Sequence, residues 1–301
     1  IACRETSDSS QLKHADSFGT RVEKYGLLAG NSVRSLDWLD VEPVGPFYAF
    51  LPQDSDIREE YLSYPSMKDA MPVNVLGFQT HRDHFAVAHE RDDVVGRCRA
   101  LRGTEFTDEE IKEKFSLKDN RDWNVRNARD AIRGDQDWKT HIMRCLYRPF
   151  DNRWCYFSSV AMDYPRRELL DHVAGKENLC LLLPRQISFL PWRHSAVSDV
   201  VAESCVISTK TKEQNYNFPL YLHPEQGSLA LAGGTRPNFS DKFLRGLSVA
   251  LRAEQQKPYG LPSSVTPEDI LHFAYAVFHS PGYRSRYAEF LKMDFPRLPL
   301  A

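Results

Sequence analysis

The sequence predicts an α+β fold, with a mixed, mostly antiparallel sheet core, inserted helices and a helical C-terminal subdomain. Short apolar segments bounded by turn residues recur between residues 140 and 225, which is typical of strands. Capped, periodic segments near 107–133 and after Thr266 indicate helices. The 301 residues are 42% hydrophobic and 27% charged, as in globular proteins with one large domain or two ordinary ones.

The N-terminal 37 residues are polar and mixed, and we expect an irregular lead-in over 1–37. A sheet-rich domain should follow over 38–225, beginning with an aromatic strand at Phe47–Leu51 that is bounded by prolines. Because residue 1 is Ile rather than Met, we expect the chain to be a piece of a longer polypeptide.

The segments before residue 140 predict both helices and strands. Residues 56–71 indicate a short helix broken at Pro65, and 75–89 indicate two short strands around a polar turn. Thr107 is an N-cap followed by acidic residues, so a helix should begin there. A second inserted helix over 120–132 should turn four apolar residues inward: Trp123, Val125, Ala128 and Ile132.

After residue 140 the sequence is dominated by strand-like segments. They are HIMRCLYRPF, RWCYFSSV, NLCLLLPRQ, SDVVAESCVIST and NFPLYLHP, with one helix predicted over 165–174. The helical subdomain should cover 226–301 and begin with a glycine-containing loop. Thr266 as N-cap, with Asp269 three residues later, starts a helix, and Ser280-Pro281-Gly282 separates it from a second one. This pattern predicts a helical hairpin.

Several classes of function lack their sequence signals. The chain has no GxGxxG, P-loop, GxSxG or HExxH motif, and no Asn/Asp-Pro-Pro-aromatic loop of amino-methyltransferases. Its longest apolar runs, such as Leu179–Leu183, are far too short to span a membrane. The six cysteines form no CxxC pair, so we expect reduced, buried thiols and no zinc site. With a net charge of −2, any nucleic-acid site must be a local patch.

One polar turn carries a possible metal site. His81, Asp83 and His84 would bind a metal if the turn gathered them, and the chain would then be a small metal-dependent hydrolase. No second ligand cluster stands at a suitable spacing, so an ordinary polar turn is the favoured interpretation.

Arginines and amides in the strand-rich centre indicate a surface for DNA. Arginine forks bind guanine edges and phosphates, while Gln and Asn suit adenine. The candidate DNA-binding residues are Thr80, His81, Arg82, Arg148, Arg153, Arg166, Arg167, Arg185, Gln186, Arg193 and His194. The alternative is that these arginines pair with Asp151, Asp163, Glu168 and Asp171 on an ordinary surface.

Several segments together resemble a known family. PFYAFLPQD, GFQTHRDHF, YRPFDNRWCYF, NLCLLLPRQ, NFPLYLHP and above all EDILHFAYAVFHSPGYRSRYAEFLKMDFPRLPL are similar to the C-terminal target-recognition region of Type ISP restriction-modification enzymes and related adenine DNA methyltransferase-helicase fusions. The resemblance runs from about residue 38 to 300. The family's chain usually continues past the DFPR segment with a short helix, so both ends of this chain look cut.

The resemblance implies that the chain reads a DNA sequence for a parent enzyme and catalyses nothing itself. Methyl transfer, ATP hydrolysis and cleavage would belong to the parent, with S-adenosylmethionine and ATP/Mg as its cofactors. The partners would be double-stranded DNA and the methyltransferase domain of the same polypeptide, against which the C-terminal helices would pack. The location would be the cytoplasm of a bacterium or archaeon, and a docking module without base readout remains an alternative.

The segment YRPFDNRWCYF (147–157) is common to the family, so it should not select bases. We therefore expect its aromatics to be framework: Tyr147, Phe150, Trp154 and Tyr156. Asp151 should cap a turn or pair with an arginine, and Arg148 or Arg153 should at most hold a phosphate. The specific readers are expected in three loops: 81–84, 158–167 and 185–194.

Overall fold

A computed structural model gives the architecture of the protein, and it describes residues 2–4, 10–188, 191–210, 213–224 and 234–300. The chain forms two compact units, Ile1–Glu60 and Tyr61–Ala301. Its described part is α+β with mostly antiparallel sheets, as the sequence predicts. No helix within it is long and apolar enough to cross a membrane.

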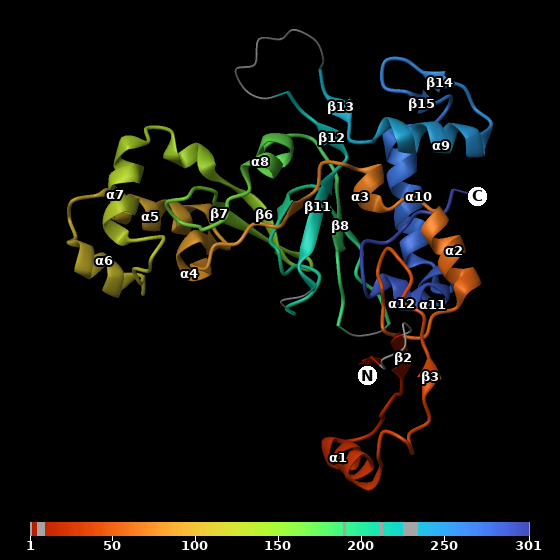
Figure 1. Cartoon of the computed structure of the whole chain (residues 1–301). Coiled ribbons are helices and arrows are strands. Elements are labelled where there is room, and N and C mark those ends of the chain that lie inside the picture. Colours follow the sequence, from red (N-terminus) through yellow and green to blue (C-terminus); the bar gives the residue numbers. More distant parts are fainter. Residues whose placement is uncertain (1, 5–9, 189–190, 211–212, 225–233, 301) are drawn as a thin grey trace. The chain divides into compact units, whose positions relative to one another are not determined.

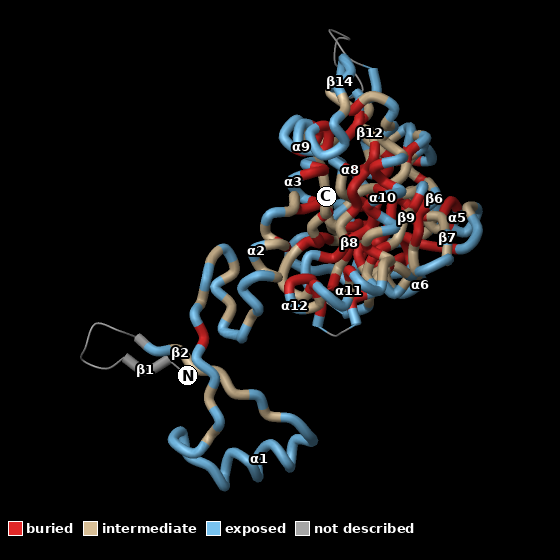
Figure 2. The backbone as a smooth tube through the Cα atoms, turned by 90° about the vertical axis from the view of Figure 1, so that its right-hand side faces the viewer, coloured by how far each residue is buried: buried red, intermediate tan, exposed pale blue. Residues whose placement is uncertain are grey.

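The first unit is more regular than the irregular lead-in predicted for 1–37. It contains a three-stranded sheet of β1 (Ala2–Arg4), β2 (Ser10–His14) and β3 (Leu39–Asp40). Helix α1 (Arg21–Gly30) begins at Thr20, whose hydroxyl accepts from the Glu23 backbone in a reciprocal capping box. No residue of α1 is buried, and Figure 2 shows it exposed along its length.

The strand predicted at Phe47–Leu51 is wrong. Residues 45–48 form a turn in which the Tyr48 backbone N–H donates to the Val44 carbonyl at 3.1 Å. Tyr48 has a φ of 47°, outside the extended region that strands require. The aromatic side chains of Tyr48 and Phe50 are exposed within this unit, so aromatic composition alone gave a misleading strand signal.

The second unit contains most of the regular structure, and Figure 1 labels its elements. Helix α2 (Ser55–Ser63) crosses the boundary between the units. The other helices are α3 (Met67–Ala70), α4 (Asp83–Ala86), α5 (Arg91–Arg102), α6 (Asp108–Lys114), α7 (Val125–Gly134), η1 (Trp138–His141), α8 (Arg167–Val173), α9 (Asp241–Leu251), α10 (Pro267–His279), α11 (Pro281–Arg286) and α12 (Ala288–Leu291). The strands are β4 (Val75–Leu76), β5 (Val87–Ala88), β6 (Ile142–Arg148), β7 (Asp151–Tyr156), β8 (Cys180–Pro184), β9 (Ala196–Ser198), β10 (Val201–Ala202), β11 (Asn215–Pro219), β12 (Tyr221–Leu222), β13 (Arg236–Pro237), β14 (Gln255–Gln256) and β15 (Leu261–Pro262).

Two four-stranded sheets form the centre of this unit. One has the order β10-β6-β7-β5, with only the β10–β6 pair parallel, and the other has the antiparallel order β4-β11-β8-β9. The chain after β4 joins them, because Phe78 bridges Glu203 and the Gly77 amide donates to the Asn215 carbonyl. A Cβ at Gly77 would lie 2.5 Å from the Ser204 nitrogen, so only glycine permits this approach.

Buried asparagines tie β11 to the segment around β10. Asn215 Oδ1 accepts from the Val206 and Ile207 amides, and its Nδ2 donates to the Glu203 carbonyl. Asn217 makes the equivalent pair of bonds with Ala202. Both side chains are fully buried, and these bonds satisfy backbone groups where the two sheets meet.

Helices α5, α6 and α7 form the insertion that packs on the first of these sheets. The predicted capping at Thr107 is confirmed, since its hydroxyl and the Glu110 carboxylate cap each other's amides. Val125, Ala128 and Ile132 face inward as predicted, but α7 begins only at Val125, and Trp123 precedes it. Figure 1 shows the three helices on the side of the sheets away from α10–α12.

The C-terminal helices pack on the second sheet's side of the unit. Thr266 and Asp269 form the predicted capping box of α10, and Ser280 caps α11. The Phe278 ring lies edge-on to Trp192 at 6.0 Å, and Phe295 contacts Tyr216 and Phe218 of β11. Figure 2 shows buried positions concentrated around β8, β12 and α10. Residues 225–233 of the loop predicted over 225–240 lie outside the described residues, and the described remainder contains the short strand β13.

The cysteines agree with the expectation of buried, reduced thiols. Among the described side chains, Cys98, Cys145, Cys155 and Cys180 are free and buried, and Cys205 is partly buried. Burial raises the pKa of the Cys98 thiol to about 12, so the neutral form dominates at neutral pH.

Candidate nucleic-acid interface

The polar turn before α4 meets the loop before α8. Gln79 and Tyr164 exchange two backbone hydrogen bonds of 3.2 Å in an isolated antiparallel bridge. Asp163 then receives two side chains from the turn: Arg82 Nη1 lies 2.7 Å from Asp163 Oδ1, and His81 Nδ1 lies 2.6 Å from Oδ2. Two of the three predicted reader loops are therefore joined in the structure.

Two candidate residues of this turn are engaged inside the protein. The Arg82 side chain is only 6% exposed, and its guanidinium lies 4.0 Å from the centre of the Trp123 ring. The buried Thr80 hydroxyl donates to Asp83 and accepts from the Arg82 amide. The turn therefore presents His81 to solvent, while Thr80 and Arg82 hold the turn together.

An exposed aromatic residue lies between two of the candidate residues. The Tyr164 ring is perpendicular to the His81 imidazole at 6.1 Å, and the Arg166 guanidinium lies 4.9 Å from the Tyr164 centroid. His81 and Arg166 have φ values of 55° and 59°, a region that residues other than glycine rarely adopt. Such strain is common at functional sites, where the surrounding fold maintains it. We did not single out Tyr164 from the sequence, although the predicted 158–167 loop contains it.

Asp163 remains ionised beneath this cluster. Its partial burial alone would raise the pKa of the carboxyl, but the hydrogen bonds from Arg82 and His81 outweigh burial and lower that pKa. The carboxylate therefore orients His81 and neutralises the buried Arg82 at neutral pH.

The β6–β7 hairpin carries two more candidates, and each has a carboxylate partner. Arg148 Nη1 lies 2.8 Å from Glu203, and Arg153 makes a bidentate pair with Asp151. The predicted pairing of Asp151 with an arginine is therefore confirmed. Both guanidiniums lie over the Tyr147 ring, at 4.0 and 4.4 Å from its centroid.

The framework role expected for the aromatics of this hairpin is wrong for Phe150. Tyr156 is fully buried and Tyr147 is partly buried, but Phe150 at the tip is fully exposed. Tyr147 donates from its hydroxyl to Asp83 Oδ2 at 2.6 Å, which connects the hairpin to the polar turn. Burial, followed by this bond to Asp83, raises the pKa of Tyr147 to about 12.

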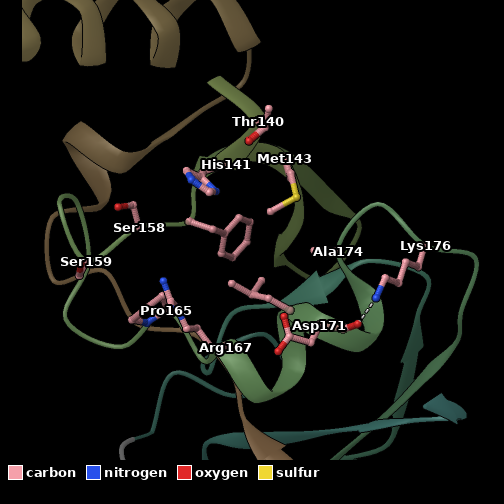
Figure 3. Close-up of a pocket in the computed structure, with 12 residues that line it drawn as sticks. Thr140, His141, Met143, Ser158, Ser159, Pro165, Arg167, Asp171, Ala174 and Lys176 are labelled. Atoms are coloured by element: carbon pink, nitrogen blue, oxygen red, sulfur yellow. Dashed lines mark hydrogen bonds between the residues drawn. The ribbon is translucent and has the colours of Figure 1, made fainter. Parts of the chain in front are cut away.

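Arg167, at the end of the 158–167 loop, lines a cavity of about 580 Å³ that is shown in Figure 3. The cavity has apolar walls from Met143, Phe157 and Leu170 and a polar rim that includes His141. Within the described residues the Arg167 side chain has no ion pair or hydrogen bond, so its guanidinium is available to a ligand.

The third predicted loop is attached to the C-terminal helices. Arg185 Nε lies 3.3 Å from Asp294, and Gln186 Nε2 donates weakly to the Met293 carbonyl at 3.4 Å. Arg193 is exposed, whereas His194 is half-buried beside Glu213 at 3.5 Å. Burial lowers the pKa of His194, and the neighbouring Glu213 only partly offsets this effect. Arg185, Gln186 and Arg193 are therefore the candidate residues that this loop exposes.

The metal-site alternative has no gathered ligands in the structure. His81 faces Asp163, Asp83 bonds Thr80 and Tyr147, and His84 Nε2 lies 2.7 Å from the Phe115 carbonyl. No group of three or more His, Cys, Asp or Glu residues in the described ranges is arranged to hold a metal ion.

Comparison with protein families decides the classification. The family model for the Type ISP C-terminal specificity domain matches residues 69–301. The chain belongs to this family. The match covers both central sheets of this specificity domain, its inserted helices and its C-terminal helices.

Solved structures of much larger proteins share the fold of the specificity domain. The cryo-electron microscopy structure of a DrdV–DNA complex has a TM-score of 0.66 at 19% identity, over 93% of this chain and 27% of that chain. A nuclease-deletion mutant of the Type ISP restriction-modification enzyme LlaGI, in complex with a DNA substrate mimic, has a TM-score of 0.63 at 19% identity, over 98% and 27%. The ATP-dependent Type ISP enzyme LlaBIII bound to DNA has a TM-score of 0.57 at 18% identity, over 87% and 17%.

The chain thus spans about a quarter of the length of the first two structures. At these identities the similarity shows the fold of the specificity domain alone. No curated protein matches the sequence.

Proposed function

We propose that the chain is the sequence-specific DNA-recognition module of a larger restriction-modification adenine DNA methyltransferase and has no catalytic activity of its own. The observation that carries this proposal is membership of the Type ISP specificity-domain family over residues 69–301. The DNA complexes of DrdV, LlaGI and LlaBIII, which share the fold, support it.

The exposed candidates are the ones we propose as DNA contacts. His81, Arg185, Gln186 and Arg193 are exposed on short loops of a rigid framework, and Arg166 is partly exposed beside Tyr164. Arginine and amide side chains on such loops can bond base edges in the major groove as well as phosphates. Arg167 belongs to the same set, at the rim of its cavity.

The remaining candidates have positioning roles in this proposal. Thr80 and Arg82 hold the turn that presents His81, and His194 is bound to Glu213. Arg148 and Arg153 are already paired, so each would hold at most a phosphate. Recognition would then depend on exposed loop residues that buried neighbours hold in position. Such support favours specific contacts.

The catalytic functions would lie in the rest of the parent polypeptide. We propose that a methyltransferase domain of that polypeptide uses S-adenosylmethionine and that ATP and Mg²⁺ serve its motor activity. LlaBIII is described as ATP-dependent and LlaGI as a restriction-modification enzyme, which supports this assignment. The parent would work on DNA in the cytoplasm of a bacterium or archaeon, and the C-terminal helices would pack on the methyltransferase domain.

A double substitution tests direct DNA contact by the third loop against a pure docking role. We expect Arg185→Ala with Arg193→Ala to weaken binding of the chain to short duplex DNA at low salt by roughly 10-fold or more. The slope of the binding constant against salt concentration, on logarithmic scales, should fall by the amount expected for the loss of about two phosphate contacts. Fluorescence anisotropy measures both quantities. Lys242→Ala with Arg245→Ala, which removes two exposed charges from α9, is the matched control. Equal loss in both double variants, or no loss in either, would favour the docking module.

A further inference from the structure

The tip of the β6–β7 hairpin exposes one phenylalanine completely. Strands β6 and β7 pair from Ile142↔Tyr156 to Arg148↔Asp151, which leaves Pro149 and Phe150 as the two turn residues. Phe150 has a φ of 61° and its side chain is fully accessible. The ring therefore projects from the end of a two-stranded ribbon.

Phe150 is unfavourable at this position on two counts. A proline followed by a residue with positive φ has the φ values of a type II turn, in which Gly or Asn normally occupies the second position. A bulky residue with positive φ is strained, and its apolar ring gains nothing from exposure to water. Neither cost is offset by a contact that the ring makes within the described chain. A contact with a ligand outside the chain would offset both costs.

The surroundings of Phe150 are charged. The charged residues nearest to it along the hairpin are Arg148, Asp151 and Arg153, and residues 142–156 contain three arginines and one aspartate. Docking sites for proteins usually combine several apolar residues around a buried centre. A single apolar ring between two arginines, each of which also has a carboxylate partner, instead resembles the wedge residues that enter a base stack while neighbouring basic side chains meet phosphates.

The strand ends next to the tip are held by neighbouring elements. Tyr147 bonds Asp83 in the polar turn and Arg148 pairs with Glu203, while the Arg153–Asp151 pair lies within β7 itself. The tip is thus supported by the same turn that presents His81 to solvent. An aromatic residue on a rigid support loses little entropy when it inserts, which favours its use as a wedge.

We propose that Phe150 inserts between adjacent base pairs of the bound duplex and partly unstacks them. This inference rests on the proposed DNA-recognition function and adds to it a contact that does not depend on base identity. The unstacked step would be the position at which the specificity domain bends its DNA.

Fluorescence of 2-aminopurine tests the insertion. A duplex enriched by the wild-type chain from a randomised library is labelled with 2-aminopurine at successive positions. We expect the wild-type chain to raise the fluorescence several-fold at one step, because unstacking relieves quenching of this base. Phe150→Ala and Phe150→Gly should abolish this rise and weaken binding by roughly 10-fold, as expected for the loss of one stacked aromatic. Phe150→Trp should preserve the rise.

Phe273→Ala removes a partly exposed ring from α10 and is the matched control, which should behave as wild type. A fluorescence rise that survives Phe150→Ala, or no rise at any position with bound wild-type chain, would overturn the insertion but leave DNA recognition standing. If the wild-type chain enriches no duplex at all, the proposed function itself fails, and the insertion fails with it. Thermal melting of each variant shows whether it is folded.

Discussion

Arg82 and Asp163 form an ion pair beneath the exposed His81–Tyr164 contact, with 2.7 Å between Arg82 Nη1 and Asp163 Oδ1. The pair connects the polar turn to the loop before α8. Because Arg82 is buried, its positive charge is balanced by this carboxylate, and its guanidinium also donates to the Thr80 carbonyl. The geometry of the candidate interface therefore depends on an ion pair whose arginine is buried.

Removing the carboxylate alone should destabilise the fold more than removing both charged groups. Asp163→Ala leaves Arg82 buried without its anion, and we expect it to lower the free energy of unfolding by about 2–3 kcal/mol. Asp163→Ala combined with Arg82→Met should cost less than Asp163→Ala alone, because no unpaired charge remains. Urea denaturation of the single and double variants measures the coupling. Additive effects of the two substitutions would show that the pair is not coupled.

Gly77→Ala should be one of the most damaging small substitutions in the chain. The added Cβ would lie within 2.6 Å of the Glu203 carbonyl carbon and the Ser204 nitrogen, which are backbone atoms at the junction of the two sheets. We expect a loss of about 3 kcal/mol in unfolding free energy. Gly96→Ala in α5 meets no atom within 4 Å and should instead stabilise by about 0.5–1 kcal/mol. Thermal melting compares the two, and similar effects at both positions would contradict the close approach at Gly77.

Three histidines should make the fold less stable in mild acid. Burial lowers the pKa values of His172, His194 and His279 below the usual 6.5. The native state then binds fewer protons than the unfolded state, so stability is fully present above about pH 6.5 and falls as the pH drops below that value. As the pH is lowered from about 7 to about 5, the denaturation midpoint of the wild type should fall, and that of His194→Gln should fall less. A flat profile in this window would refute the expectation.

Phe150→Gly should leave the fold as stable as before or stabilise it. Glycine adopts a φ of 61° without strain, and the substitution removes a ring that contacts solvent only. We expect an unchanged unfolding free energy or a gain of up to about 1 kcal/mol. Phe150→Ala keeps part of the strain and serves as the comparison. A clear loss of stability in Phe150→Gly would show that the ring packs against the fold.

Capped and periodic segments were the most predictable parts of the fold. The helices after Thr107 and Thr266 begin where their capping residues indicate, because the cap and the first turn are local features. The sequence predictions include no helix over Arg91–Arg102, where charged residues hide the four buried positions of α5. The false strand at Phe47–Leu51 and the unpredicted α1 show that aromatic content and polarity do not determine local structure without their tertiary context.

The candidate site was predictable only at the level of loops. Sequence positions indicated that 81–84 and 158–167 carry polar tips, and the structure joins these segments through Asp163. Which arginine is buried could not be read from sequence, because Arg82 depends on Trp123 and Asp163, which are distant along the chain. The exposure of Phe150 likewise depends on the β6–β7 register and not on its apolar character.

Selection of DNA by the chain itself tests the central claim most directly. The purified wild-type chain would be incubated at low salt with a duplex library that has a randomised core, and bound molecules would be sequenced over successive rounds. The proposed function predicts that one sequence motif is enriched, and that the Arg185→Ala, Arg193→Ala variant enriches it less or not at all. Bound DNA with no enriched motif would contradict sequence-specific recognition by this domain.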